Sequence, residues 1–162
     1  MSLRRFAAAC CCAAALLACR AEPAANVSQA QPARTEPSGL ELVPLEIRSG
    51  ERTHRFTVEV AATPDEQARG LMFRASLGPD EGMIFPFPSP RVASFWMRNT
   101  LIPLDMIFIR DDGTIARVAA ETVPLSEEAV SSGEPVIAVL ELRGRRAAEL
   151  GIAEGDRVVW PR

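Results

Sequence analysis

Cysteine is confined to one end of this 162-residue chain. The four cysteines are Cys10, Cys11, Cys12 and Cys19, so residues 20–162 contain none. That region therefore lacks the means for a disulfide, a thiolate metal site or a cysteine nucleophile. Whatever stability it has must come from its core.

Lysine and tyrosine are absent, and all 18 basic residues are arginine. This bias is typical of a GC-rich genome and is not by itself a sign of phosphate or carboxylate recognition. Without the two arginines at positions 4 and 5, 16 basic side chains face 21 acidic ones, a formal charge near −5. Nucleic-acid binding needs clustered positive charge, so we expect no nucleic-acid partner.

Motifs of common catalytic and cofactor sites are also missing. The single histidine, His54, lies beside two arginines in a predicted strand. The chain has no Gly-x-Ser-x-Gly elbow, no glycine-rich phosphate loop and no His-x-x-x-His pair. The sequence therefore predicts no cofactor and gives little support to a hydrolase built on a catalytic triad.

The first residues have the pattern of an export signal. A basic pair at 4–5 precedes an apolar run over 6–18, which is shorter than the ~20 residues that cross a bilayer. The run ends in Leu-Leu-Ala-Cys, which resembles the lipobox of bacterial lipoproteins. We predict a signal peptide over 1–18 and lipidation of Cys19, with an ordinary secretory signal as the alternative. Arg20 resembles the default for outer-membrane sorting, so we expect an outer-membrane lipoprotein on the periplasmic side.

Residues 19–39 predict a tether. They are small, polar and proline-bearing, and such a composition cannot bury enough apolar surface to order itself. The remaining residues, 40–162, have the length of a single domain.

This domain has mainly the pattern of short strands. Two strands are predicted around the turn at 49–51, and strands over 82–87 and 92–97 are interrupted by prolines, which favours edges or bulges. A hairpin is predicted over 104–120, followed by a buried strand over 135–142 and a closing strand over 155–160.

Two short helices complete the prediction. Thr63 is a candidate N-cap, Pro64 fits the first helical position, Glu66 completes a capping box and Gly70 suits the exit. The second helix is predicted over 145–151. Together these elements predict a compact, mainly β fold, a barrel or sandwich with two short helices.

Two predicted strands are apolar on both faces except for one carboxylate each, Asp105 and Glu141. An unpaired buried carboxylate is costly, so each must meet a partner. For Asp105 the candidates are N–H groups of the 99–102 turn, Arg98 or Arg74. Glu141 has Arg143 or Arg157 as candidates, or it lies where its strand leaves the core. The alternative puts both carboxylates in one cleft, the equipment of a glycoside hydrolase.

Four methionines, Met72, Met83, Met97 and Met106, fall within 35 residues, and Trp96 adjoins one of them. Thioethers are soft ligands for Cu(I). Methionine also fills core gaps, and all four lie among apolar residues. Core packing is the preferred interpretation, and Cu(I) binding is a further alternative.

Several segments resemble the DUF192 family, a set of small bacterial and archaeal proteins, often exported and of unknown function. They are RGLMFRASL, DEGMIFPF, FWMRNTLIPLDMIFI, DGTIARV and AVLELRGRRAAELGIAEGDRV. The resemblance covers residues 40–162 and implies a compact β domain, but no activity. The family pattern has lysine where this chain has Arg98, a change that preserves charge but not geometry.

The polar and amphipathic members of these segments form the candidate ligand site. Placed polar groups among apolar walls are typical of binding pockets. The candidates are Arg69, Arg74, Glu81, Trp96, Met97, Arg98, Asn99, Thr100, Asp105 and Glu141. The alternative is that Trp96 is core and that Asn99 and Thr100 only cap a turn.

These observations favour a lipid-anchored envelope protein over an enzyme. We expect a binding or accessory domain for a small molecule, an envelope polymer or a partner protein, attached to the membrane through Cys19. A hydrolase using Asp105 and Glu141 is the alternative.

Overall fold

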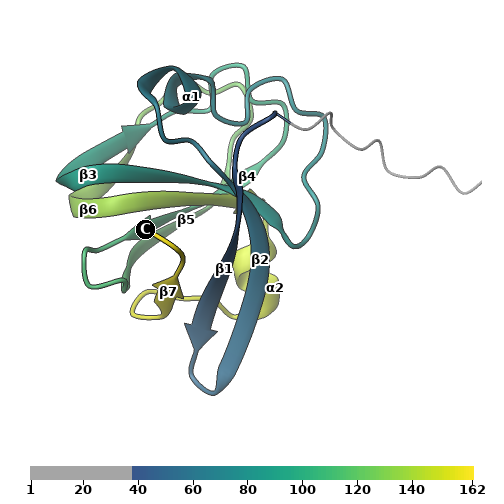
Figure 1. Ribbon diagram of the computed structural model, residues 1–162. Coiled ribbons are helices and arrows are strands. Elements are labelled where there is room, and N and C mark those ends of the chain that lie inside the picture. Colours follow the sequence, from purple (N-terminus) through teal and green to yellow (C-terminus); the bar gives the residue numbers. More distant parts are fainter. Residues whose placement is uncertain (1–37) are drawn as a thin grey trace, which may run out of the picture. The chain divides into compact units, whose positions relative to one another are not determined.

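The computed structural model describes residues 38–162, so the predicted signal peptide, Cys19 and nearly all of the predicted tether lie outside the described residues. Within these residues, seven strands and two short helices follow one another in the order that Figure 1 labels. They are β1 (Leu42–Ser49), β2 (Arg52–Val60), α1 (Pro64–Arg69), β3 (Glu81–Phe95), β4 (Leu104–Ile109), β5 (Ile115–Thr122), β6 (Val130–Arg143), α2 (Arg146–Leu150) and β7 (Arg157–Val159). Within residues 38–162, neither helix is long and apolar enough to cross a membrane.

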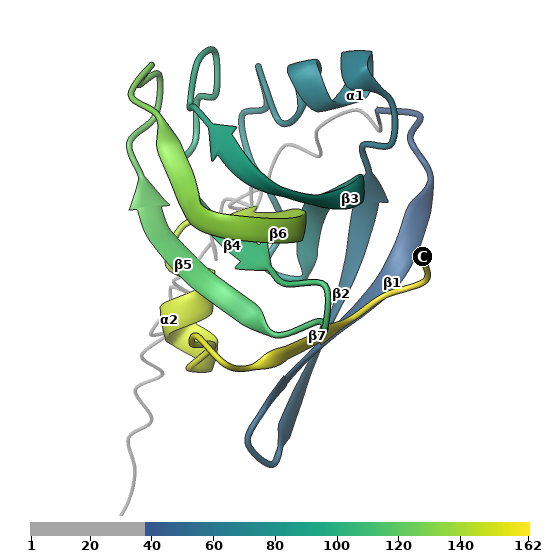
Figure 2. The same ribbon diagram turned by 90° about the vertical axis from the view of Figure 1, so that its left-hand side faces the viewer.

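All seven strands belong to one curled sheet. Their order is β5-β4-β6-β3-β2-β1-β7, and neighbours are antiparallel except for the parallel pair β2 and β3. The two edge strands approach each other at one end, where Thr114 bridges Arg157 and the Ile115 N–H donates to the Asp156 carbonyl at 2.8 Å. Figure 2 shows this curvature from the side, with α1 above the sheet and α2 beside β5. The predicted compact, mainly β fold with two short helices is confirmed, in the form of a half-barrel.

Local sequence signals account for several of these elements. The β1–β2 and β4–β5 hairpins form where turn residues separate apolar runs. Helix α1 begins with the predicted capping box, in which the Thr63 hydroxyl accepts from the Glu66 N–H and the Glu66 carboxylate accepts from the Thr63 N–H. Helix α2 ends at Gly151, which has the left-handed conformation that glycine adopts without penalty.

The prediction of two proline-interrupted strands over 82–87 and 92–97 was wrong in one respect. Both belong to the single strand β3, which lies inside the sheet between β6 and β2. Its register with β6 shifts between Pro86 and Arg91 and again between Val92 and Ser94. Bulges thus accommodate the prolines, which cannot donate ladder hydrogen bonds.

The sheet carries a hydrophobic cluster on each face. One cluster joins β1, β2 and α2 to the centre of the sheet and includes Ile47, Val58 and Ala147. The other includes Leu71, Phe85 and further side chains of β3, β4 and β6. Both faces of β4 and most of β6 are therefore buried, which explains why these strands lack the usual alternation.

Candidate functional site

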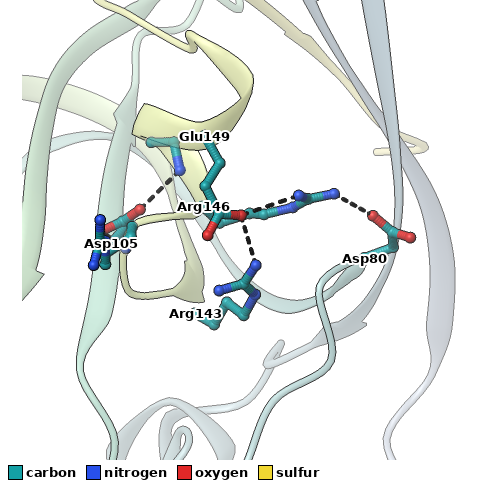
Figure 3. Close-up of polar contacts among 7 residues, drawn as sticks. Asp80, Asp105, Arg143, Arg146 and Glu149 are labelled. Atoms are coloured by element: carbon teal, nitrogen blue, oxygen red, sulfur yellow. Dashed lines mark hydrogen bonds and ion pairs between the residues drawn. The ribbon is translucent and has the colours of Figure 1, made fainter.

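Asp105 is completely buried at the second position of β4, and backbone N–H groups satisfy it. One carboxylate oxygen accepts from Glu121 N–H at 2.8 Å and from Arg145 N–H at 3.1 Å, and the other accepts from Ala147 N–H at 2.8 Å. Two of these donors belong to the start of α2, whose own N-cap residue makes no side-chain cap (Figure 3). The predicted partners of Asp105, the 99–102 turn, Arg98 and Arg74, were wrong. Asp105 caps a helix from a distant strand.

A short ionic network lies beside this cap. The Arg146 guanidinium donates to Asp80 at 2.7 Å and to Glu149 at 3.2 Å, and Arg143 donates to the same Glu149 oxygen at 2.6 Å (Figure 3). These groups are partly exposed, so the network fastens α2 rather than forming a ligand site.

Asp105 and Glu141 do not share a cleft. In the antiparallel pairing of β4 with β6, Asp105 stands opposite Leu142, and Glu141 stands opposite Met106. Residues directly opposite each other project to the same face of a sheet, and neighbours along a strand project to opposite faces. The two carboxylates therefore point to opposite sides, and the geometry that a paired-carboxylate hydrolase requires is missing.

Glu141 lies near the end of β6 inside the sheet. Its direct neighbours across the two adjacent strands are Met83 of β3 and Met106 of β4, both buried. Its exposed fraction is 4 %, and within residues 38–162 no hydrogen bond or ion pair reaches its carboxyl group. The predicted partners Arg143 and Arg157 bond elsewhere, to Glu149 and to the Asp112 carbonyl.

The environment of Glu141 changes its protonation. Burial raises the pKa of the Glu141 carboxyl to about 8, because the charged form loses its hydration. Most Glu141 side chains are therefore neutral at pH 7. A neutral carboxyl group can donate one hydrogen bond and accept others.

Glu141 faces a pocket of about 450 Å³. This volume is within the range of roughly 300 to 1,000 Å³ that small-ligand sites occupy. The pocket is lined by residues of α1, β3, β6 and three connecting segments. They are Gln67, Ala68, Arg69, Gly70, Leu71, Met72, Phe85, Arg91, Ser94, Phe95, Trp96, Arg98, Thr100, Glu127, Ala129 and Glu141.

Helix α1 is fixed over the sheet as one wall of this pocket. The Gln67 amide donates to the Ala61 carbonyl at 3.1 Å and to the Pro86 carbonyl at 2.9 Å. Gly70 ends the helix with φ +47°, and a Cβ atom there would lie 3.3 Å from the Phe85 ring. Glycine is therefore favoured at this exit both by backbone conformation and by close packing.

The segment after β3 forms another wall. Its backbone is held between two loops, since Met97 N–H donates to the Ser126 carbonyl at 2.9 Å and Phe73 N–H donates to the Asn99 carbonyl at 2.8 Å. Asn99 adopts φ +57°, a left-handed conformation that asparagine tolerates better than most residues. This turn leaves Trp96 49 % exposed at the pocket.

Five of the ten predicted site residues line this pocket: Arg69, Trp96, Arg98, Thr100 and Glu141. Asn99 lies in the adjoining turn, where its amide contacts the Met72 sulfur at 3.8 Å. The remaining predicted residues, Arg74, Glu81, Met97 and Asp105, are not part of the lining.

Those outside the pocket have structural partners. Arg74 forms a two-pronged ion pair with Glu59, with both N–O distances 2.5 Å. Burial opposes the charge of Glu59, but the hydrogen bonds from Arg74 and Ser38 outweigh it and hold the Glu59 pKa below its usual value. Glu81 accepts from Gly78 N–H at 2.9 Å in a turn, and Met97 is a core residue.

Three of the four clustered methionines, Met83, Met97 and Met106, belong to one buried hydrophobic cluster. Met72 lines the pocket instead. Residues 38–162 contain no group of three or more histidine, cysteine, aspartate or glutamate side chains placed to hold a metal ion. Core packing accounts for the three buried methionines.

A second hollow of about 400 Å³ lies beside the C-terminal residues. Its lining is mostly apolar, and its two charged residues, Glu41 and Arg162, are both exposed. Because it contains no buried polar group, it is a weaker candidate for specific recognition than the pocket at Glu141.

The sequence profile of the DUF192 family, which is described as "Uncharacterized ACR", matches residues 45–160. The chain belongs to the DUF192 family. A protein of unknown function from Novosphingobium aromaticivorans DSM 12444 has a crystal structure that is 48% identical, with a TM-score of 0.75, over 82% of this chain and 94% of that one. The crystal structure of a Sinorhizobium meliloti 1021 protein, provisionally named as a transcription regulator, is also similar. It is 41% identical, with a TM-score of 0.73, and the match covers 75% of this chain and 95% of that one. No curated protein matches the chain.

The similarity covers 95% and 94% of the two crystallised chains. Residues 38–162 of this chain contain the whole sheet and both hydrophobic clusters, and are therefore a suitable unit for experiments.

Sequence reasoning missed several lining residues of this DUF192 domain, notably Gln67, Arg91, Phe95 and Glu127. Gln67 stands in the predicted α1 helix, but no local signal distinguishes it from a solvent-facing residue. Arg91 and Glu127 lie in segments with no motif. Only contacts between distant segments bring them to the pocket.

Proposed function

We propose that this DUF192 protein is a binding domain for a small organic ligand, held in the pocket under α1. The observation that carries the proposal is the Glu141 carboxyl, buried to 4 % exposure, without a partner in residues 38–162, and facing that pocket. Its oxygens are reachable from the pocket, since the buried side-chain atoms without a hydrogen-bond partner in residues 38–162 are His54 Nε2 and Arg146 Nε. A ligand in the pocket can form a hydrogen bond with this carboxyl group, which supports a binding role for the site.

Binding is favoured over hydrolysis because the two carboxylates that hydrolysis would use lie on opposite faces of the sheet. It is favoured over Cu(I) coordination because three of the four methionines pack in the core. A nucleic-acid partner is not proposed, because the acidic charge balance of the chain opposes phosphate binding.

Thermal unfolding of residues 38–162 tests the proposal. The panel contains sugars, peptidoglycan fragments, amino acids, aromatic acids, amines and Cu(I) under reducing, anaerobic conditions. A ligand at 100 times its dissociation constant adds about 2.7 kcal/mol of stability, which moves the midpoint by several degrees. We expect one chemical class to raise the midpoint.

Two variants test whether the rise in the unfolding midpoint comes from binding in the pocket. Trp96→Ala removes an aromatic wall of the pocket, and Phe73→Ala removes an exposed aromatic side chain that is not part of the lining. The shift should be lost in Trp96→Ala and kept in Phe73→Ala. A shift that both variants keep would place binding elsewhere, and no shift with any compound would argue for a protein partner instead.

We also propose that the domain is attached to the outer membrane on its periplasmic side through a lipid on Cys19. The support is the Leu-Leu-Ala-Cys sequence after a basic pair and a short apolar run. The expressed full chain should fractionate with membranes and carry acyl chains on Cys19 by mass spectrometry. The Cys19→Ala variant should lose both properties, and recovery of unmodified wild-type chain in the soluble fraction would contradict the anchor.

A further inference from the structure

The charges around the pocket are unevenly distributed. Arg69, Arg91 and Arg98 line it and are exposed, and none of them pairs with a carboxylate within residues 38–162. The Arg91 guanidinium lies 3.9 Å from the centre of the Phe87 ring, and that of Arg98 lies 5.3 Å from the centre of the Trp96 ring. A guanidinium that rests on an aromatic ring keeps its N–H groups available for an anion.

The opposite end of the pocket is uncharged at neutral pH. The buried Glu141 forms the floor, between two methionines, whereas the three arginines stand at the exposed mouth. The charged groups that share the pocket with Glu141 are Arg69 of α1, Arg91 of β3, and Arg98 and Glu127 of the connecting segments. Burial alone sets the raised pKa of Glu141, so these groups do not restore its charge.

Aromatic side chains also line the pocket. Phe85 and Phe95 pack edge to face, with ring centres 5.1 Å apart and an angle of 86°, and Trp96 is the next residue. Flat apolar groups are well suited to such walls.

We propose that the pocket binds a flat organic acid that carries a second, uncharged polar group at its far end. The acid group contacts Arg91 and Arg98, the ring system packs on Phe95 and Trp96, and the far polar group bonds the Glu141 carboxyl. This inference rests on the proposed function and names its ligand class. A simple fatty acid does not fit, because its tail would leave the buried Glu141 without a hydrogen bond.

Three related compounds separate the two ends of the ligand. The full probe is 6-carbamoyl-2-naphthoate, whose amide can both donate to and accept from a neutral carboxyl group. The compound 2-naphthoate lacks the amide, and 2-naphthamide lacks the acid group. By calorimetric titration of residues 38–162 at pH 7, we expect the full probe to bind at least about tenfold more tightly than either fragment. A hydrogen bond to a charged or buried partner changes the dissociation constant by about this factor.

Protein variants test which residues contact the acid group of the probe and which contact its amide. Arg91→Ala/Arg98→Ala should abolish the advantage of the full probe over 2-naphthamide, whereas the exposed arginine variant Arg55→Ala should keep it. Glu141→Leu should abolish the advantage of the full probe over 2-naphthoate. Circular dichroism confirms that each variant is folded, and the comparison of the three compounds on the unchanged protein does not depend on any variant.

The pH dependence gives an independent readout. A matched probe, 6-acetyl-2-naphthoate, carries a ketone that can only accept, and it should lose about tenfold in affinity between pH 7 and pH 9, because ionised Glu141 can no longer donate a hydrogen bond. In Glu141→Gln, which cannot ionise, the affinity should not change with pH over this range. An affinity that stays constant or rises with pH in the unchanged protein would overturn the hydrogen bond from a protonated Glu141.

Equal binding of the full probe and 2-naphthamide would overturn the role of the arginines, and equal binding of the full probe and 2-naphthoate would overturn the role of Glu141. If no naphthalene probe binds but another compound raises the unfolding midpoint in a Trp96-dependent manner, the ligand class is wrong and the proposed function stands. If nothing binds in either experiment, both fail.

Discussion

The stability of this domain should fall as the pH rises from 5 to 8, and Glu141 should be the cause. In the unfolded chain the Glu141 carboxyl ionises near its ordinary pKa of 4.5, whereas in the folded domain its pKa is about 8. Between these values the folded state holds one proton that the unfolded state has released. Folding then takes up a proton, and the free energy of unfolding decreases with increasing pH.

The size of the effect follows from the two pKa values. Each pH unit between them costs about 1.4 kcal/mol, so Glu141 should remove roughly 3 kcal/mol between pH 5 and pH 7 and roughly 5 kcal/mol over the whole interval. A small domain has only about 5 to 15 kcal/mol in total. Such a cost at a single position is typical of a residue kept for function rather than for stability.

Urea unfolding of residues 38–162 and of Glu141→Gln at pH 5, 6, 7 and 8 measures this cost. The variant cannot ionise, so it should be the more stable protein at pH 8, and the gap should narrow toward pH 5. For m-values of about 1 to 3 kcal/mol/M, the difference between the two midpoints should change by roughly 1 to 3 M between pH 5 and pH 7. The other carboxylates are the same in both proteins and cancel in this difference. Parallel midpoint curves would refute the argument, since they would mean that Glu141 ionises equally in both states.

Three further variants test structural roles. Asp105→Asn replaces one oxygen that accepts from Glu121, Arg145 or Ala147 by an N–H₂ donor, and should cost roughly 2 to 3 kcal/mol in urea unfolding; unchanged stability would contradict the cap. Arg74→Met leaves the Glu59 carboxylate buried without its cation and should cost about 3 to 5 kcal/mol, whereas an added Glu59→Leu change should restore most of it; a loss that the second change does not recover would rule out the ion pair as its source. Gly82→Ala places a Cβ atom 2.7 Å from the Glu141 carbonyl oxygen and should cost roughly 1 to 3 kcal/mol, visible as a lower thermal midpoint; a midpoint equal to that of the unchanged protein would show that β3 and β6 can separate there.

Asp105 and Glu141 have different roles in the structure, although they occupy similar positions in the sequence pattern. Each interrupts a strand that is otherwise apolar on both faces. The structure surrounds Asp105 with three N–H donors and leaves Glu141 facing a pocket. Asp105 therefore stabilises α2, and Glu141 is the residue to follow in binding experiments.

Elements governed by neighbouring residues could be predicted from the sequence. The capping box of Thr63 and Glu66 and the end of α2 at Gly151 depend on contacts within a few residues. The hairpins follow from turn residues between apolar runs. Local signals did not suffice for the proline-bearing β3, which was predicted as two strands but is one bulged strand inside the sheet.

The sequence by itself determined the mainly β fold and the two short helices, because turn chemistry, capping and strand periodicity are local. Tertiary structure alone decided which polar residues meet. Glu141 shares a pocket with Arg69, Arg91, Trp96 and Arg98 only because the curled sheet and α1 bring their segments together. A strand pattern reveals that a carboxylate is buried, but the register of β6 against β3 and β4 decides the face to which it points.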